Sequence, residues 1–246
     1  MTLTKSLTRP LTRPLVSGLE GYSSSQDLPE GVTLLNYYPL RNNLIDNVTG
    51  SSASFSRAST STIIDWRGSS INFAVNEPAF SGLDIGLNYG SSNDSLQVST
   101  TGWPVNDVSF YLRVRNFTAL NLSGSNVFFD SVDNGPNDIL FNYSTSLGQL
   151  FFRKRLSTVN YVAAIPVTIN DGDTVEVIGE LSSVDGVTLK YLDMIGNDPN
   201  TDDAVISPTA ALGSRIPLTS PTRGYHGNFK VFSGTGLTFE QARNAV

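Results

Sequence analysis

The chain has 246 residues, of which only 15% are charged, and it carries a formal net charge of −6. Charged residues make up about 25% of an average globular protein, so hydroxyl and amide side chains must solvate much of this surface. The acidic balance excludes a globally basic nucleic-acid binder. With no cysteine and a single histidine, His226, the sequence also excludes disulfides, thiolate metal sites and His-cluster zinc sites.

The beginning of the chain differs from the rest. Leucine recurs at every fourth position, but Pro10 and Pro14 interrupt the same stretch. Because proline removes a helix hydrogen bond and clashes with the preceding turn, the pattern favours an extended arm over a helix. We predict that residues 1–30 form an anchoring arm that docks onto a partner; the alternative is an arm folded back onto its own domain. The predicted anchoring residues are Leu3, Leu7, Leu11, Leu15 and Leu19.

Neither export nor membrane insertion is indicated. The N-terminal segment lacks the apolar core of about 7–15 residues that a secretory signal contains. The longest apolar runs, such as residues 161–167, are far shorter than the roughly 18 residues that a membrane helix needs.

After the arm, the sequence predicts β-structure throughout, in short segments rich in Val, Ile, Phe, Tyr and Thr. The clearest alternation lies in residues 107–117, where Val108, Phe110, Leu112 and Val114 fall on one face. A period of two is what a half-buried strand requires. The further predicted strands are residues 127–132, 139–143, 150–156, 161–169, 174–181, 187–194 and 228–232.

Turn and helix signals complete the predicted fold. Gly186 lies between two of these strands and predicts a hairpin turn, because glycine accepts a positive φ. Thr238 and Gln241 have the spacing of a capping box, which predicts a short helix over residues 239–245. Many short strands with almost no helix favour a two-sheet sandwich or jelly roll. We therefore predict an all-β domain over residues 31–246.

Two stretches resemble a known family. Residues 54–80 read SFSRASTSTIIDWRGSSINFAVNEPAF, with an Arg-Ala-Ser turn, two strands around an Asp/Gly turn, and an Asn-Glu-Pro-Ala-Phe ending. Residues 227–245 read GNFKVFSGTGLTFEQARNA, a strand followed by a short helix. Both stretches are similar to segments of tailed-bacteriophage virion proteins with a concanavalin-A-like (laminin-G-like) jelly roll. Ala79 departs from the pattern, since an arginine is expected before the aromatic residue.

The resemblance implies a concanavalin-A-like jelly-roll sandwich with an extended N-terminal arm and a short C-terminal helix. It further implies a non-enzymatic virion component (capsid decoration, fibre or tail protein) whose arm contacts other virion proteins and which forms a homo-oligomer. Head or tail placement, copy number and host stay open. The family also contains lectins and glycosidases, so a host surface glycan is a further expected partner. The alternatives are a carbohydrate-binding receptor-recognition module and, third, a glycoside hydrolase.

One segment near the C-terminus has the composition of a sugar-binding loop. Arg223 precedes Gly224, and Tyr225 and His226 lie between Gly224 and Gly227. Sugar recognition combines a ring face for C–H groups with planar donors and acceptors for hydroxyls. We predict carbohydrate binding by these three residues, with Trp66 and Trp103 as further ring faces. Core packing is the alternative for both tryptophans.

The acidic residues predict neither a catalytic nor a metal site. Asp171, Asp173 and Glu176 approach the spacing of the catalytic strand of concanavalin-like endoglucanases, but Asp171 directly precedes a glycine and so indicates a turn. Residues 130–138 and 198–203 are rich in oxygen ligands suited to calcium, yet the same residues are ordinary in turns. We expect no catalytic residue, no metal and no cofactor, and leave calcium at residues 130–138 open.

Basic residues interrupt one predicted strand. Arg153, Lys154 and Arg155 are consecutive within residues 150–156. A charged strand is typical of a sheet edge that is protected against unwanted pairing. The alternative is contact with an acidic neighbour. No glycine-rich loop precedes a helix, so nucleotide binding is unsupported.

Overall fold

The structure is a computed structural model. It describes residues 28–40, 45–55, 62–64, 70–72, 95–118, 124–132, 137–213, 220–221 and 223–246. The predicted anchoring leucines and Trp66 lie outside these residues. The described part consists of sixteen strands and one short helix. Within these residues, no helix is long and apolar enough to cross a membrane.

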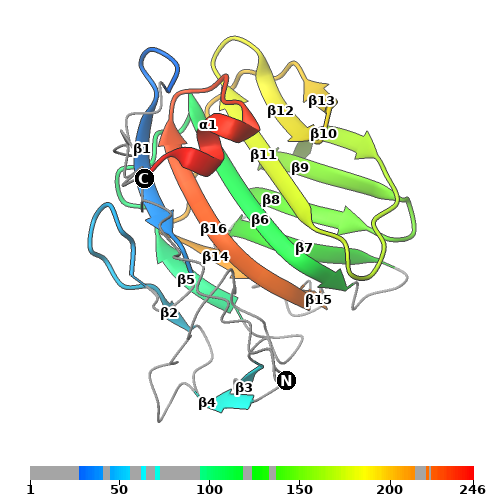
Figure 1. Ribbon diagram of the computed structural model, residues 1–246. Coiled ribbons are helices and arrows are strands. Elements are labelled where there is room, and N and C mark those ends of the chain that lie inside the picture. Colours follow the sequence, from blue (N-terminus) through cyan, green and yellow to red (C-terminus); the bar gives the residue numbers. More distant parts are fainter. Residues whose placement is uncertain are drawn as a thin grey trace, which may run out of the picture.

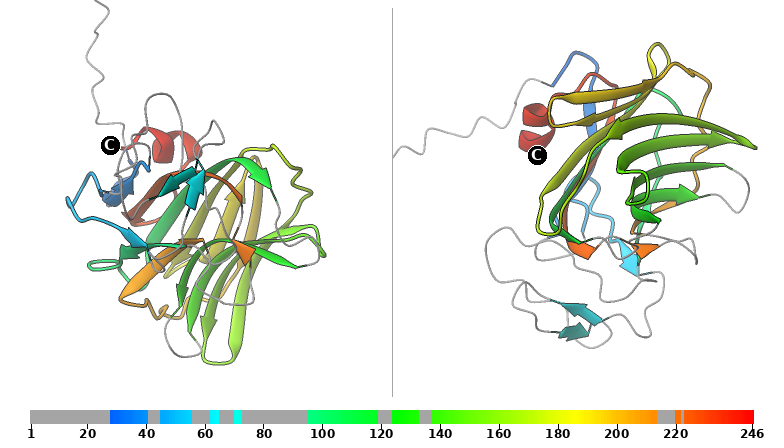
Figure 2. Two further views of the ribbon diagram at one scale, coloured as in Figure 1. Left: turned by 90° about the horizontal axis from the view of Figure 1, so that it is seen from below. Right: turned by 90° about the vertical axis from the view of Figure 1, so that its right-hand side faces the viewer.

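Two antiparallel sheets face each other (Figures 1 and 2). The six-stranded sheet has the order β1 (Thr33–Tyr38), β16 (Arg223–Ser233), β6 (Val108–Thr118), β11 (Val175–Ser182), β12 (Gly186–Tyr191) and β13 (Met194–Asp198). The eight-stranded sheet has the order β10 (Val159–Pro166), β9 (Gln149–Leu156), β8 (Asp138–Ser144), β7 (Ser125–Val132), β14 (Thr209–Gly213), β5 (Ser95–Ser99) and β2 (Ser54–Phe55). Its eighth strand, β15 (Ser220–Pro221), pairs in parallel with β7.

A third, two-stranded sheet lies in the stretch that carries the family resemblance. Strands β3 (Thr62–Ile64) and β4 (Ser70–Asn72) pair antiparallel, with Ile63 opposite Ile71. The pairing confirms the two short strands expected around the Asp/Gly turn.

Aromatic side chains fill the space between the two large sheets. The rings of Phe141 and Phe152 lie 4.4 Å apart between centroids, and those of Phe129 and Phe229 lie 5.3 Å apart. Such pairs add about 0.5–1.5 kcal/mol beyond the area that they bury. Gly179 on β11 makes this packing possible, because a Cβ there would collide with the rings of Phe141 and Phe152. The core thus fixes which side of each strand faces inward.

Trp103 belongs to this core. Its side chain is buried, and its Nε1 donates a hydrogen bond of 2.5 Å to Oδ1 of Asn36. Asn36 in turn donates from Nδ2 to the buried carboxylate of Asp46 at 2.6 Å. The core-packing alternative is therefore correct for Trp103.

The short helix α1 (Phe239–Asn244) covers the outer face of the six-stranded sheet (Figures 1 and 2). The capping box is confirmed: Thr238 Oγ1 accepts from the Gln241 backbone N–H at 3.2 Å, and Gln241 Oε1 accepts from the Thr238 N–H at 3.0 Å. A second apolar cluster holds the helix down. Its buried members are Tyr111, Ile178, Phe232, Leu237, Ala242 and Ala245.

The predicted hairpin at Gly186 is confirmed, because this residue has φ 82° between the antiparallel β11 and β12. The predicted single strand over residues 187–194 is wrong. It divides into β12 and β13, with Tyr191 paired to Met194 across a tight turn. Leu192 takes the left-handed conformation there, at φ 54°, where no glycine marks the turn in the sequence.

The prediction that residues 153–155 mark a sheet edge is also wrong. Strand β9 lies between β10 and β8. The charges are tolerated because each has a partner within the chain: Arg153 and Arg155 bind Asp138, and Lys154 Nζ donates to the backbone oxygens of residues 200 and 202. Asp138 belongs to this same chain, so the functional alternative, contact with an acidic neighbour, stays a prediction.

Candidate functional site

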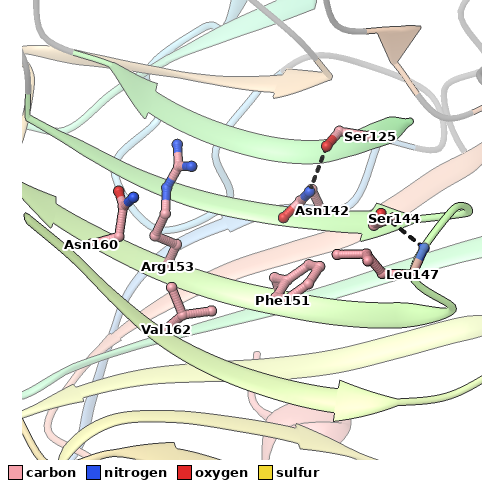
Figure 3. A pocket seen from close by; sticks show the side chains of 8 residues that line it. All are labelled: Ser125, Asn142, Ser144, Leu147, Phe151, Arg153, Asn160 and Val162. Carbon is pink, nitrogen blue, oxygen red and sulfur yellow. Dashed lines mark hydrogen bonds between the residues drawn. The ribbon is translucent and has the colours of Figure 1, made fainter. Parts of the chain in front are cut away.

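The outer face of the eight-stranded sheet carries a cavity of about 220 Å³. Its lining comes from β7, β8, β9, β10 and the turn between β8 and β9 (Figure 3). The lining residues are Ser125, Asn142, Ser144, Leu147, Phe151, Arg153, Asn160 and Val162.

Strand alternation explains why these side chains point outward. Phe141 and Phe152 face the core, so their neighbours Asn142, Phe151 and Arg153 face the opposite side. Register then brings the strands into line: Asn142 lies directly opposite Phe151, and Arg153 lies opposite Val162. The cavity is therefore a consequence of the same pattern that builds the core.

The amide and hydroxyl groups of the cavity are only partly engaged. Asn142 Nδ2 donates to Ser125 Oγ at 3.1 Å, and Ser144 Oγ accepts from the Leu147 backbone N–H at 3.4 Å. These bonds leave Oδ1 of Asn142 available. The side chain of Asn160 is exposed, and no hydrogen bond joins it to another of the described residues.

An ion-pair cluster borders the cavity. Arg153 donates from Nε to Asp138 Oδ1 at 3.0 Å and from Nη2 to Oδ2 at 2.8 Å, a bidentate geometry. Arg155 Nη2 lies 2.7 Å from the same Oδ2. The Asp138 side chain is fully buried, whereas those of Arg153 and Arg155 are 24% and 32% exposed.

This cluster bears on the calcium hypothesis for residues 130–138. The carboxylate of Asp138 is engaged by two guanidinium groups. Across the described ranges, no group of three or more acidic or histidine side chains is placed to hold a metal ion. Residues 133–136 lie outside those ranges.

The predicted sugar-binding segment lies elsewhere. Arg223, Tyr225 and His226 belong to strand β16 of the six-stranded sheet, so their assignment to a loop is wrong. Two irregularities in the β16–β6 register accommodate the flanking glycines, as β-bulges commonly do. The cavity on the eight-stranded sheet does not include these three residues, and sugar binding by them stays a prediction.

The acidic candidates are structural. Asp171 lies in a turn with Gly172, which has φ 92°. Glu176 lies on the outer face of the six-stranded sheet and accepts from Arg243 Nε and Nη2 at 2.6 Å each, and from the Tyr111 hydroxyl at 2.6 Å. Burial by itself raises the pKa of Glu176, but the hydrogen bonds from Arg243 and Tyr111 outweigh it and hold the pKa below its usual value. Glu176 is thus an ionised anchor for α1.

Sequence reasoning missed the cavity residues Asn142, Phe151 and Asn160. The available signal was Phe151, since the alternation that places Leu150 and Phe152 in the core puts this large ring on the outward face. An outward aromatic beside Arg153, in a strand interior, is the combination that marks this surface.

No family model matches the chain, and no curated protein matches it. Solved structures with a similar fold include domain 4 of AbnA, a GH43 extracellular arabinanase from Geobacillus stearothermophilus, in complex with arabinotriose. The TM-score is 0.63 at 16% identity, covering 87% of this chain and 99% of that one.

Botulinum neurotoxin structures are also similar. The serotype D ligand binding domain in complex with N-acetylneuraminic acid has a TM-score of 0.58 at 12% identity, over 86% of this chain and 49% of that one. A structure of botulinum neurotoxin type C, a toxin whose cell entry depends on interaction with two ganglioside molecules, has a TM-score of 0.54 at 14% identity. The match covers 83% of this chain and 49% of that one. The present chain spans about half the length of these two toxin chains. The likeness confirms the predicted all-β jelly-roll sandwich.

Proposed function

We propose that this protein is a non-catalytic carbohydrate-binding module whose ligand lies in the cavity on the outer face of the eight-stranded sheet. One observation carries the proposal. A half-buried aromatic ring, Phe151, lies in a cavity with amide and guanidinium groups that retain hydrogen-bonding capacity (Figure 3).

The chemistry of the lining suits a sugar. The face of Phe151 packs against the apolar C–H patch of a pyranose or furanose ring. Oδ1 of Asn142 accepts from a sugar hydroxyl, and the Asn160 amide both donates and accepts. The cavity volume of about 220 Å³ is below the roughly 300–1,000 Å³ of sites for drug-sized ligands, which suits one or two sugar units rather than a buried chain.

Two comparisons support the ligand class. The arabinanase domain was solved with arabinotriose, and the serotype D binding domain with N-acetylneuraminic acid. Both share the sandwich fold of this chain. Fold alone does not assign a function, so the assignment rests on the cavity side chains.

The arrangement of acids supports binding rather than hydrolysis. Glycosidases generally use two carboxyl groups that flank the scissile bond. The lining of the described cavity contains no Asp or Glu. Glu176 lies on the other sheet, where Arg243 and Tyr111 occupy its carboxylate.

We also propose the wider role that the family resemblance implies: a structural component of a tailed-phage virion that displays this module and is anchored by residues 1–30. The position of Leu28 supports the anchoring role. Leu28 belongs to residues 1–30 and packs against the α1 cluster, so it lies on the face opposite the cavity and leaves the cavity open. Many copies per particle would turn a weak sugar contact into tight attachment. Deletion of residues 1–27 should abolish incorporation into particles; normal incorporation of the shortened chain would overturn the anchoring role.

The binding proposal is tested with the full chain on a glycan array, followed by calorimetry with the best oligosaccharide. Phe151→Ala should weaken binding about tenfold, equal to about 1.4 kcal/mol. Phe239→Ala is the matched control, since it removes a half-buried aromatic from α1 on the opposite face. Absence of binding by the wild type, or equal loss in both variants, would overturn the proposal.

A further inference from the structure

Among the described residues that line the cavity, Arg153 alone carries a charge. Its partner Asp138 does not neutralise this corner of the site, because Arg155 binds the same carboxylate. Two positive charges therefore share one negative charge within hydrogen-bonding distance. A further acid among the described residues of this face, Asp130, lies two strands from Arg153 with Leu140 between them, so the two backbones are roughly 10 Å apart.

The guanidinium of Arg153 is held in place with one edge unused. Nε and Nη2 donate to Asp138, and no hydrogen bond joins Nη1 to another of the described residues. Figure 3 shows the side chain projecting from β9 across the neighbouring strand within the cavity lining. Because the bidentate pair already fixes the rotamer, an anion that binds at Nη1 costs little side-chain ordering.

The surroundings strengthen an anion contact at this position. The Arg153 side chain is 24% exposed, so water screens it less than it screens a free surface arginine. Val162 lies directly opposite on β10 and contributes an apolar wall. A planar guanidinium edge matches the geometry of a carboxylate better than that of a lone hydroxyl.

We propose that the glycan recognised in this cavity is acidic, and that its carboxylate accepts hydrogen bonds from Nη1 of Arg153. The proposal rests on the carbohydrate-binding function above. Asp138 is a positioning residue that aims the guanidinium. Arg155 holds Asp138 and so leaves Arg153 with an uncompensated charge.

The test compares an acidic oligosaccharide with its carboxyl-reduced, neutral counterpart by calorimetry on the full chain. The wild type should bind the acidic form at least tenfold more tightly, and this ratio should fall as NaCl rises. Arg153→Gln should lower the ratio to about one. Arg153→Lys keeps the positive charge but lacks the planar guanidinium group, so it should give an intermediate ratio.

Arg155→Gln separates charge from geometry, because it removes the same charge from the same strand but leaves Nη1 of Arg153 in the cavity lining. With Arg155 gone, Asp138 compensates Arg153 alone, so the acid-to-neutral ratio should fall only part of the way toward that of Arg153→Gln. Thermal unfolding of each variant shows that it is folded, and the ratio between two ligands is insensitive to a uniform loss of active protein.

The outcomes separate the two proposals. A wild type that binds no glycan overturns the carbohydrate-binding function and this inference together. A wild type that binds acidic and neutral forms equally overturns this inference alone. A preference for sulfated over carboxylated sugars overturns the assignment of the carboxylate, and an Arg155→Gln effect as large as that of Arg153→Gln overturns the role of Nη1.

Discussion

The two outer faces of the sandwich handle polar groups in opposite ways. On the six-stranded sheet, α1 covers the surface, and Lys230 Nζ donates to three backbone oxygens, those of Ala242, Arg243 and Ala245. On the eight-stranded sheet, no helix of the described residues covers the cavity, and within the same residues Nη1 of Arg153 makes no hydrogen bond (Figures 2 and 3).

This difference distinguishes polar side chains that stabilise the fold from polar side chains that are available to bind a ligand. Buried donors and acceptors are costly when unpaired, so a face closed by its own helix must satisfy them internally. A face whose half-buried cavity is lined by hydrogen-bond donors and acceptors that remain unpaired is suited to binding a ligand. Changes on the covered face should therefore affect stability alone, and changes on the open face should affect binding alone.

Lys230→Met should give the largest loss of stability. The side chain is fully buried, and its ammonium satisfies the carbonyls at the end of α1. Removing three charge-assisted hydrogen bonds should lower the free energy of unfolding by about 4 kcal/mol, measured by urea denaturation. Lys190→Met is a milder control, because that side chain is 19% exposed. Wild-type stability in Lys230→Met would contradict the role of this lysine in holding the helix.

Alkaline pH should weaken the fold next most strongly. Burial, reinforced by Asp46, raises the pKa of Tyr38 to about 12, and burial followed by the Glu176 hydrogen bond raises the pKa of Tyr111. Unfolded tyrosines ionise near pH 10, so this stability is full below about pH 10 and is lost as pH rises toward 12. The loss from Tyr38 amounts to about 2–3 kcal/mol. Measuring the free energy of unfolding from pH 9 to 12 checks this loss. In Tyr38→Phe, the free energy of unfolding should fall less steeply over the same pH range.

Glu176→Gln should have a smaller effect. The Arg243 side chain is 49% exposed, so solvent screens the pair, and we expect a loss of about 1 kcal/mol at pH 7. Since the pKa of Glu176 is lowered in the folded state, its contribution is present above the usual carboxyl pKa and disappears as pH falls through the folded value. The difference between variant and wild type should therefore shrink as the pH falls progressively below the usual carboxyl pKa. A difference that grows in acid would contradict this ion pair.

Asn160→Ala should have the smallest effect on stability and the opposite pattern. Its side chain is exposed and makes no hydrogen bond with another of the described residues, so the free energy of unfolding should change by less than about 0.5 kcal/mol. Affinity for the bound sugar should fall severalfold by calorimetry. Unchanged affinity would remove Asn160 from the site and weaken the division between the two faces.

Local patterns predicted much of the sandwich. The alternation in residues 107–117, the turn at Gly186 and the capping box at Thr238 each depend on neighbours in sequence, and each matches the structure. The turn at Leu192 was missed because the tertiary pairing of β12 with β13 imposes a positive φ on a residue with no turn signal.

The candidate site was harder to predict. Its lining comes from four strands, and only their order and register bring Asn142, Phe151 and Asn160 to one surface. The sequence also did not indicate which face α1 covers. Glu176 resembled a catalytic acid in spacing, but its partner Arg243 is 67 residues away in the chain.

Leu28, Val32 and Leu34 pack against the same cluster as Ala245, so residue 28 and the carboxyl end of the chain emerge on one side of the sandwich. A support joined to either position would lie behind the six-stranded sheet. In a regular array of copies tethered in this way, the cavity on each eight-stranded sheet would face the surrounding medium, away from the support.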